Sequence, residues 1–318
     1  MPDKNLRDSF ARVRTEVGKA VVGQDAAVTG LIIALLASGH VLLEGVPGVA
    51  KTLLIRALSQ TLSLESKRVQ FTPDLMPGDV TGSLVYDAKA GEFEFRAGPV
   101  FTNILLADEI NRTPPKTQSA LLEAMEERQV SVDGESRALP VPFIVAATQN
   151  PIEYEGTYTL PEAQLDRFLM KLVIDLPERN DEVEVLRRHS TGFNPRDLAA
   201  AGVTAVLDAD GLAQAQVAVG NVGASDDVIG YAVDLARGTR QSPSVKLGVS
   251  PRGTTALLAA AKAWAWLNGF DAITPDHIQA MALPVMRHRI QLRPEAELEG
   301  VSADSILRSV LQQVQVPI

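Results

Sequence analysis

The chain has 318 residues, of which 46% are hydrophobic and 22% charged, and its formal net charge is −9 at pH 7. This composition is ordinary for a globular protein with one large or two medium domains. The absence of cysteine excludes disulfides and thiolate metal sites, and the acidic balance offers no electrostatic footprint for nucleic acid. We find no signal-peptide core at Met1, and the longest apolar run, Leu31–Ala37, is too short to span a bilayer. We therefore expect a cytoplasmic protein without membrane insertion.

The first predicted strand, Val41–Leu43, leads into a glycine turn. The turn reads Gly45-Val-Pro-Gly-Val-Ala-Lys-Thr52, and Leu53–Gln60 follows with helical spacing. A strand, a glycine turn that ends in Lys-Thr and a helix form the context of a phosphate-binding P-loop. Glycines let the backbone approach closely, and a helix N-terminus attracts anions. We expect Lys51 to reach the β- and γ-phosphates and Thr52 to ligate Mg²⁺.

This turn departs from the P-loop pattern at one position. The pattern has glycine immediately before the lysine, whereas this chain has Ala50 there and a second glycine earlier, at Gly48. Alanine is harmless at that position if its φ is negative, but it strains the loop if its φ is positive. An ordinary strand–helix turn is the alternative interpretation of the whole segment.

Two segments predict β-hairpins that a plain α/β unit does not need. After a predicted strand at Lys67–Phe71, the residues of Ser83–Arg96 alternate on both sides of a short turn. Val130–Leu139 is a second candidate, with Asp133-Gly134 in its turn. The outward residues of the first hairpin are of mixed charge, which fits either a solvated hairpin or a projection that contacts a partner.

Two acids follow the apolar run at 104–107. Such a run fits a strand buried on both faces, and ligands bind at the carboxyl ends of strands in open α/β sheets. Asp108 is expected to hold Mg²⁺ through its water shell, and Glu109 to orient and deprotonate the attacking water. The expected metal residues are Thr52 and Asp108. The expected nucleotide-binding residues are Gly45, Val46, Pro47, Gly48, Val49, Ala50, Lys51, Thr52, Leu53 and Asp108.

Three polar residues farther along the chain are further candidates. Asn150 ends a predicted buried strand, where its amide would hold the attacking water or the γ-phosphate, unless Asn150-Pro151 is only a turn. Arg167 suits an arginine finger, although a salt bridge on the domain surface fits it equally well. Arg252 follows Ser250-Pro251, a good helix start, and would point either at another domain or into solvent.

Pro177 marks a change in the pattern of the chain. Phe168–Ile174 is the last predicted strand, and the pattern is helical from Glu178 onward. We therefore expect an α/β nucleotide-binding domain at 1–177, with the two hairpins as insertions, and a helical domain at 178–318. Its predicted helices are Glu178–His189, Leu212–Val219, Asp226–Arg237, Pro251–Trp266 and Pro275–Leu283.

Six motifs together span most of the chain: Gly45–Thr52, Val69–Asp79, Leu106–Arg112, Ala147–Pro151, Glu155–Phe168 and Ser250–Arg252. In this combination the chain resembles the MoxR family of AAA+ ATPases, whose P-loop also has alanine before the lysine. The resemblance implies an AAA+ P-loop core, which is a parallel sheet flanked by helices, and a C-terminal all-helical lid domain.

The resemblance also implies roles and partners. It makes Lys51 and Thr52 Walker A residues, Asp108 and Glu109 Walker B residues, Asn150 sensor 1, Arg167 the arginine finger and Arg252 sensor 2. ATP or ADP with Mg²⁺ would bind between the subunits of a ring, usually a hexamer. The two hairpins resemble the helix-2 insert and the pre-sensor-1 insertion. The implied partners are a von Willebrand factor A domain protein and a client complex.

The leading hypothesis is an ATPase that assembles or remodels partner complexes, or that helps insert a metal or cofactor into them. The alternatives are a magnesium-chelatase-type ATPase subunit, a nucleic-acid motor and a nucleotide switch. A DNA motor needs cationic hairpins, whereas the hairpin tips at 87–92 and 133–135 are mixed or acidic. Glu109 argues against a switch, because a switch needs no base.

Overall fold

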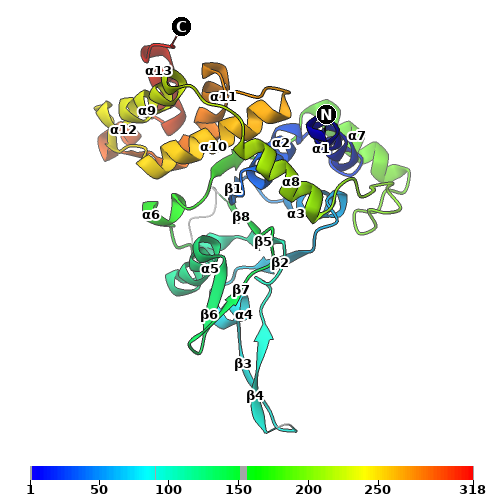
Figure 1. The fold of residues 1–318 in the computed structure, drawn as a ribbon. Helices are drawn as coiled ribbons and strands as arrows, with labels where there is room; N and C mark the ends of the chain where they lie inside the picture. Colours follow the sequence, from blue (N-terminus) through cyan, green and yellow to red (C-terminus); the bar gives the residue numbers. More distant parts are fainter. Residues whose placement is uncertain (1, 90, 151–155, 318) are drawn as a thin grey trace.

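The computed structural model of the protein describes residues 2–89, 91–150 and 156–317. Pro151 and Glu155, which belong to two of the motifs above, lie outside the described residues. Within the described part of the chain, a parallel sheet has the C-terminal helices on one side, and two β-hairpins extend in the opposite direction (Figure 1). No helix in this part of the chain combines the length and the apolarity that crossing a membrane requires.

The central sheet has five parallel strands in the order β2-β5-β8-β1-β9. They are β1 (Val41–Glu44), β2 (Ser66–Gln70), β5 (Ile104–Asp108), β8 (Ile144–Gln149) and β9 (Met170–Val173). Each coincides with a predicted strand within a few residues. Because the strands are parallel, the loops after β1, β5 and β8 leave the same edge of the sheet, and the order places these three strands side by side. This is where α/β sheets bind ligands.

Alternation along the strands divides the core into two clusters. Val41 and Leu43 of β1 pack on one face of the sheet, whereas Leu42 packs on the other. The first face is covered by α1 (Pro2–Gly18), α2 (Asp25–Leu36) and α3 (Lys51–Thr61), and the second by α5 (Pro115–Glu127). A sheet covered on both faces explains why its strands read as continuous apolar runs.

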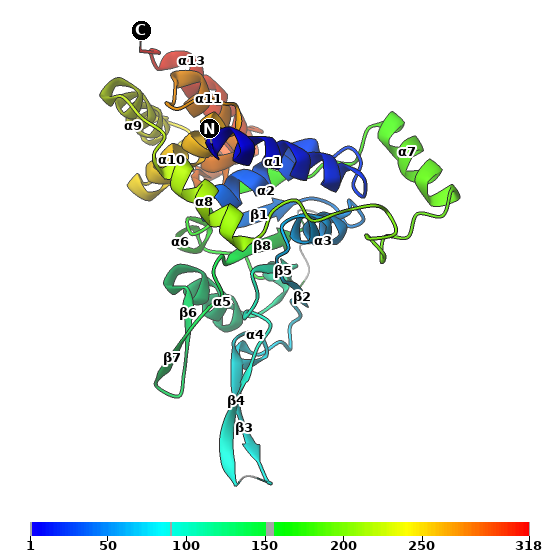
Figure 2. The ribbon, with the colours of Figure 1, turned by 45° about the vertical axis from the view of Figure 1, so that its right-hand side comes forward.

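Both predicted hairpins are present. Strands β3 (Gly82–Asp87) and β4 (Glu92–Ala97) pair antiparallel after the short helix α4 (Pro77–Thr81), and β6 (Gln129–Val132) pairs with β7 (Glu135–Ala138). The β3–β4 hairpin extends well away from the sheet (Figure 2). Another molecule can contact an extended hairpin of this kind without disturbing the core.

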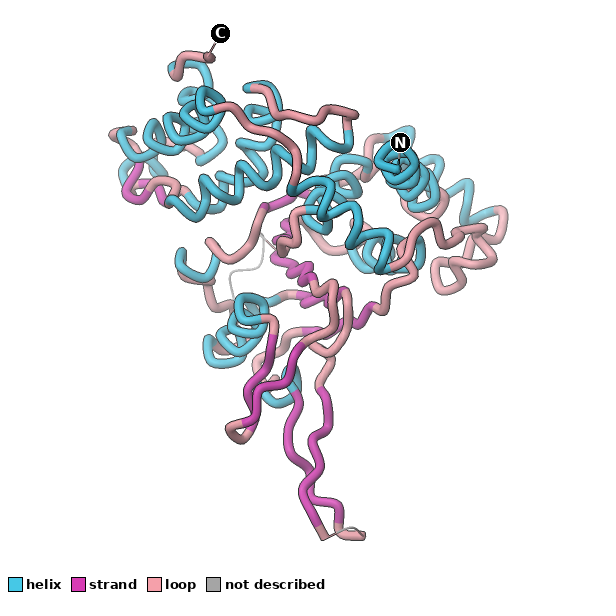
Figure 3. Tube along the Cα trace, in the orientation of Figure 1, coloured by secondary structure: helices cyan, strands magenta, loops and turns pink. Residues whose placement is uncertain are grey.

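The chain after β9 is helical, with one correction to the expectation that it contains no strand. Its helices are α7 (Arg179–Ser190), α8 (Ala209–Gly220), α9 (Asp226–Gln241), α10 (Pro251–Leu267), α11 (Pro275–Met286), α12 (Pro294–Leu298) and α13 (Ala303–Gln313). Between them, β10 (Val245–Leu247) pairs antiparallel with β11 (Gln291–Leu292) (Figure 3). Strands of three and two residues are too short to leave a periodic pattern in a sequence.

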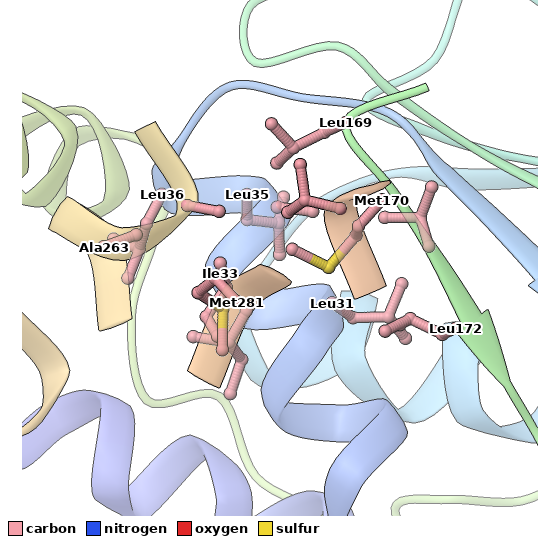
Figure 4. Close-up of a cluster of buried hydrophobic side chains, with 14 of the residues drawn as sticks. Leu31, Ile33, Leu35, Leu36, Leu169, Met170, Leu172, Ala263 and Met281 are labelled. Atoms are coloured by element: carbon pink, nitrogen blue, oxygen red, sulfur yellow. The ribbon is translucent and has the colours of Figure 1, made fainter. Parts of the chain in front are cut away.

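The C-terminal helices share a core with the sheet. Figure 4 shows Leu31 and Leu35 of α2 beside Met170 and Leu172 of β9, with Ala263 of α10 and Met281 of α11 nearby; all six are buried. Helix α7 instead stands at the edge of the molecule, away from this core (Figure 2). The face of the sheet that α2 covers is therefore held against most of the helical region through α2.

Candidate nucleotide site

The P-loop connects β1 to α3 at the carboxyl edge of the sheet. Gly45 is required by a close approach, because a Cβ there would lie 2.5 Å from the carbonyl oxygen of Ile174. Gly48 has φ of +89° and Ala50 has φ of +60°, so both are left-handed. Ala50 thus adopts the φ that strains an alanine. These two residues turn the backbone just before α3 begins at Lys51.

Lys51 projects from the first turn of α3 toward the turn that precedes it. Its Nζ donates to the Gly45 carbonyl oxygen at 2.8 Å. Burial lowers the pKa of Lys51, whereas the negative charges of Asp108 and Glu109 raise it. The ammonium therefore lies within electrostatic reach of both carboxylates, as the P-loop interpretation requires.

Asp108 ends β5 and is held on both carboxylate oxygens. The Thr148 hydroxyl of β8 donates to Oδ1 at 2.6 Å, and Arg68 Nη2 of β2 donates to Oδ2 at 2.7 Å. The strand order makes these contacts, because β5 lies between β2 and β8. The aspartate is therefore fixed in orientation from two neighbouring strands.

Glu109 follows in a left-handed conformation, with φ of +57°. Its backbone N–H donates to the Thr148 hydroxyl at 2.8 Å. Gln70 Nε2 donates to its Oε2 at 2.7 Å, and Arg112 Nε lies 3.1 Å from the same oxygen. The carboxylate that is expected to act on water is thus held by an amide and a guanidinium.

A cavity of about 780 Å³ joins these groups. Its lining includes the turn residues Pro47, Gly48, Val49, Ala50, Lys51, Thr52 and Leu53 and the polar side chains of Arg68, Gln70, Asp108, Glu109 and Asn150. Apolar residues line another part of it: Val21, Val22, Val185, Leu186 and Phe193. Gly45 and Val46 do not line the cavity; Gly45 contacts Lys51, and Val46 packs against the apolar core. A glycine turn that carries a lysine, together with these apolar residues, matches the two ends of a nucleotide.

Arg167 and Arg252 lie elsewhere, in a second cavity of about 390 Å³. Arg167 Nη2 is 2.8 Å from Oε2 of Glu126 in α5, and Arg252 Nη1 is 3.3 Å from Oε1 of the same carboxylate. Neither arginine lines the P-loop cavity of its own chain. The structure thus places the candidate residues in two groups rather than one.

Sequence reasoning missed several residues of the site. Arg68 and Gln70 lie two apart on one side of β2, but their pairing with β5 depends on the strand order. Thr148 precedes Asn150 in the same predicted strand and could have been noticed as a polar residue in an apolar run. Glu126 gave no signal, because it is one of several acids at the end of α5.

The donor set fits a magnesium ion that is shared with phosphates. The described residues contain no group of three or more His, Asp or Glu that could form a metal site by themselves. Mg²⁺ usually takes only one or two protein oxygens together with phosphate oxygens and water. The Thr52 hydroxyl and the Asp108 carboxylate line the same cavity and can supply these.

Comparison with known proteins agrees with this geometry. A family model described as ATPase family associated with various cellular activities (AAA) matches residues 40–170, and an AAA lid domain model matches residues 237–310. Chaperone MoxR1 of Mycobacterium tuberculosis is 40% identical and covers 97% of this chain and 82% of its own length. The chain belongs to the MoxR family of AAA+ ATPases. The predicted family and its ATPase activity are thereby confirmed.

Two further relatives cover almost the whole length of this MoxR-family chain. YeaC of Bacillus subtilis is 49% identical over 99% of this chain and 97% of its own. A crystal structure of a Cytophaga hutchinsonii protein is 39% identical and superposes with a TM-score of 0.92, covering 100% of this chain and 97% of that one. The predicted AAA+ core with a helical lid is confirmed. The boundary at 177/178 stays a prediction, since it falls between the two matched family models.

Proposed function

We propose that this MoxR-family ATPase binds ATP with Mg²⁺ in the P-loop cavity, that copies of the chain form a ring, and that turnover drives the assembly or remodelling of a partner complex. One observation carries the proposal. Lys51, Thr52, Asp108, Glu109 and Asn150 line a single cavity at the carboxyl edge of the sheet. These are the groups that phosphoryl transfer to water needs.

Each group has a defined task at the phosphate end. The Lys51 ammonium and the N-terminus of α3 bind the phosphate oxygens. Thr52 and Asp108 would hold Mg²⁺, which neutralises the charge that develops on the phosphates. Lys51 already has a carbonyl partner and Asp108 a guanidinium partner, so both side chains exchange partners when a nucleotide binds.

Glu109 acts on the attacking water. As the water oxygen forms a bond to the γ-phosphorus, the bond to the bridging oxygen breaks, and Glu109 takes a proton from the water. Asn150 positions the water or the γ-phosphate. Gln70 and Arg112 hold Glu109 before that step, and Glu109 has to leave at least one of them to reach the water.

Arg167 and Arg252 support a ring. AAA+ proteins typically form rings, usually hexamers, in which an arginine of one subunit reaches the nucleotide of the next. Both arginines lie outside the P-loop cavity of their own chain, so action on an adjacent copy gives each a phosphate to bind. The sequence does not decide whether Arg252 acts in its own subunit or in an adjacent one; we propose that it acts in an adjacent one.

The relatives and the hairpins support an interaction with partner proteins. The M. tuberculosis relative is named a chaperone. The β3–β4 hairpin carries an exposed aromatic pair, Tyr86 and Phe93, with ring centroids 5.3 Å apart. We propose that the hairpins contact a client complex in the cytoplasm, together with a von Willebrand factor A domain protein.

Two substitutions test the nucleotide site. We expect Lys51→Ala to lose binding of a fluorescent ATP analogue, because the phosphates lose their cation. We expect Glu109→Gln to keep binding and to lose turnover, because it loses only the base. Lys262→Ala, on the surface of α10, is the lysine control. Unchanged affinity for the ATP analogue in Lys51→Ala would overturn the P-loop assignment. Turnover in Glu109→Gln equal to that of the unmodified chain would contradict the role of Glu109 as the base.

A further inference from the structure

A buried arginine of the helical region, Arg289, lies beside the segment that carries Arg167. Its side chain is only 2% exposed, and its Nε donates to Asp166 Oδ1 at 2.6 Å. Its Nη groups donate to the carbonyl oxygens of Asp166, Phe168, Leu169 and Val285. These five acceptors satisfy all five N–H groups of an arginine. Arg289 therefore holds the backbone on both sides of Arg167 and has no N–H group left for a phosphate.

The second carboxylate oxygen of Asp166 bonds to the start of α10. Ser250 Oγ donates to Asp166 Oδ2 at 2.8 Å and, as the N-cap, accepts from the Gly253 N–H at 3.1 Å. A Cβ on Gly253 would lie 2.7 Å from the Cδ of Arg289, so a glycine lets this turn pack directly on the buried arginine. Asp166 thus connects its own segment to the helix end that carries Arg252.

The two arginines held in this way converge on one small anion. Glu126 offers Oε2 to Arg167 and Oε1 to Arg252, at 2.8 and 3.3 Å. Two guanidinium groups that can share one carboxylate can also share the oxygens of one phosphate. Their relative position depends on Asp166, because Asp166 is adjacent to the first and bonded to the N-cap of the second.

We propose that Asp166 is the positioning residue that sets Arg167 and Arg252 as one two-arginine group for the γ-phosphate bound by an adjacent copy. The inference rests on the proposed function, since it takes both arginines to act between copies. Both oxygens of Asp166 are bonded, to Ser250 and Arg289, so Asp166 acts through other residues and does not touch the phosphate.

The first test is Asp166→Asn in the full-length chain. An amide keeps the shape of the carboxylate but cannot accept from Ser250 and Arg289 through both of its terminal atoms. We expect kcat to fall about 100-fold, as for other small displacements of catalytic groups, with the ATP dissociation constant unchanged. Asp304→Asn is the control, because it breaks the neighbouring Arg287–Asp304 pair of 2.9 Å and leaves Asp166 alone. A kcat of Asp166→Asn equal to that control overturns the proposal.

Mixing subunits separates positioning from general damage. Lys51→Ala subunits keep their arginines, and Asp166→Asn subunits keep their P-loop, so mixing the two is expected to restore part of the turnover. Arg167→Ala mixed with Lys51→Ala is the reference. Recovery in the reference alone overturns the role of Asp166 and leaves the proposed function intact. No recovery in the reference overturns action between copies, and the inference with it.

A second variant decides the question if Asp166→Asn does not fold. Ser250→Ala removes the bond from the N-cap to Asp166 and keeps the Asp166–Arg289 pair. We expect about a 10-fold lower kcat at unchanged ATP affinity, and Ser250→Thr, which restores a hydroxyl, to recover most of that loss. A kcat in Ser250→Ala equal to that of the unmodified chain overturns the proposal.

Discussion

The P-loop cavity and the cavity beside Arg167 differ in how their charges balance. The first has as many cationic as acidic side chains, namely Lys51, Arg68 and Arg188 with Asp108, Glu109 and Glu182. The second has twice as many arginines as acids, namely Arg128, Arg167, Arg252 and Arg289 with Glu126 and Asp166. An excess of arginine over carboxylate attracts an anion from outside the chain. The charges of the first cavity therefore balance within one chain, whereas the second cavity keeps an excess of positive charge.

Arg167→Ala is expected to have the largest effect on the second cavity. If the second cavity serves a nucleotide on another copy, kcat falls by about 10³, as for other arginine fingers, whereas ATP affinity is unchanged. Steady-state turnover and equilibrium binding measure the two effects separately. Arg287→Ala is the control, since Arg287 pairs with Asp304 at 2.9 Å and lines neither cavity. A loss of ATP affinity in Arg167→Ala would mean that the arginine serves its own P-loop.

His40 lines the second cavity and directly precedes β1, the strand that leads into the P-loop. Its Nδ1 accepts from the Val145 N–H at 2.9 Å, so its Nε2–H donates to the Met125 carbonyl oxygen at 3.1 Å. Burial, with a smaller contribution from the nearby charge of Arg128, lowers the pKa of His40 to about 4, although the hydrogen bond to Met125 raises it. The imidazole is therefore neutral in the folded protein, and it fixes the start of β1 against α5.

Protonation of His40 is expected to destabilise the fold. Between pH 6.5 and about 4 the unfolded chain binds a proton that the folded chain excludes, so stability is full above pH 6.5 and falls as the pH falls. The loss reaches about 3 kcal/mol at the low end. We expect urea denaturation at pH 7.5 and pH 5 to show a smaller difference for His40→Gln than for the unmodified chain.

Other residues set the background for this measurement. Burial also lowers the pKa of His288, which adds a loss in the same direction, so the pH dependence becomes shallower in His40→Gln but does not vanish. His189→Gln is the control because its side chain is exposed. An identical pH dependence in His40→Gln and the unmodified chain would contradict a neutral, buried His40.

The two cavities also differ in how far the sequence predicts them. The P-loop and the Asp108-Glu109 pair are contiguous motifs at strand ends, so their type, spacing and common edge follow from the sequence. The partner of Arg167, Glu126, does not follow from the sequence, because it is 41 positions earlier and comes close only through the packing of α5. The contact of Arg68 with Asp108 depends likewise on β2 lying next to β5, which no local pattern specifies.

Substitution of Thr148, beside the P-loop cavity, is expected to have a smaller effect. Thr148 is fully buried, and its hydroxyl donates to Asp108 and accepts from the Glu109 N–H. Thr148→Val keeps the shape and leaves two polar groups without a partner, which costs about 1–3 kcal/mol of stability. Since the Asp108 carboxylate and the Glu109 backbone both lose an anchor, kcat is expected to fall about 10-fold. The measurements are urea denaturation and steady-state turnover.

Thr61→Val is the control that separates the loss of stability in Thr148→Val from its loss of kcat. Thr61 is also fully buried, and its hydroxyl donates to the Leu58 carbonyl oxygen at 2.8 Å, at the far end of α3 from the P-loop. We expect it to lose stability while kcat stays unchanged. An equal loss of kcat in both variants would show that turnover follows stability and that the Thr148 hydroxyl has no special role.

The smallest effect is expected at Ala50, in the turn that lines the P-loop cavity. Ala50 has φ of +60°, which costs an L-residue about 1–2 kcal/mol. Ala50→Gly removes that strain but adds freedom to the unfolded chain, worth about 0.4–1 kcal/mol. We therefore expect a net gain of about 1 kcal/mol or less in urea denaturation. Ala57 lies in the middle of α3, the helix that follows Ala50. Ala57→Gly is expected to lower the free energy of unfolding by about 1 kcal/mol, because glycine weakens a helix interior. Opposite signs at two alanines seven residues apart would come from φ alone, and a loss at both would rule out the left-handed turn before Lys51.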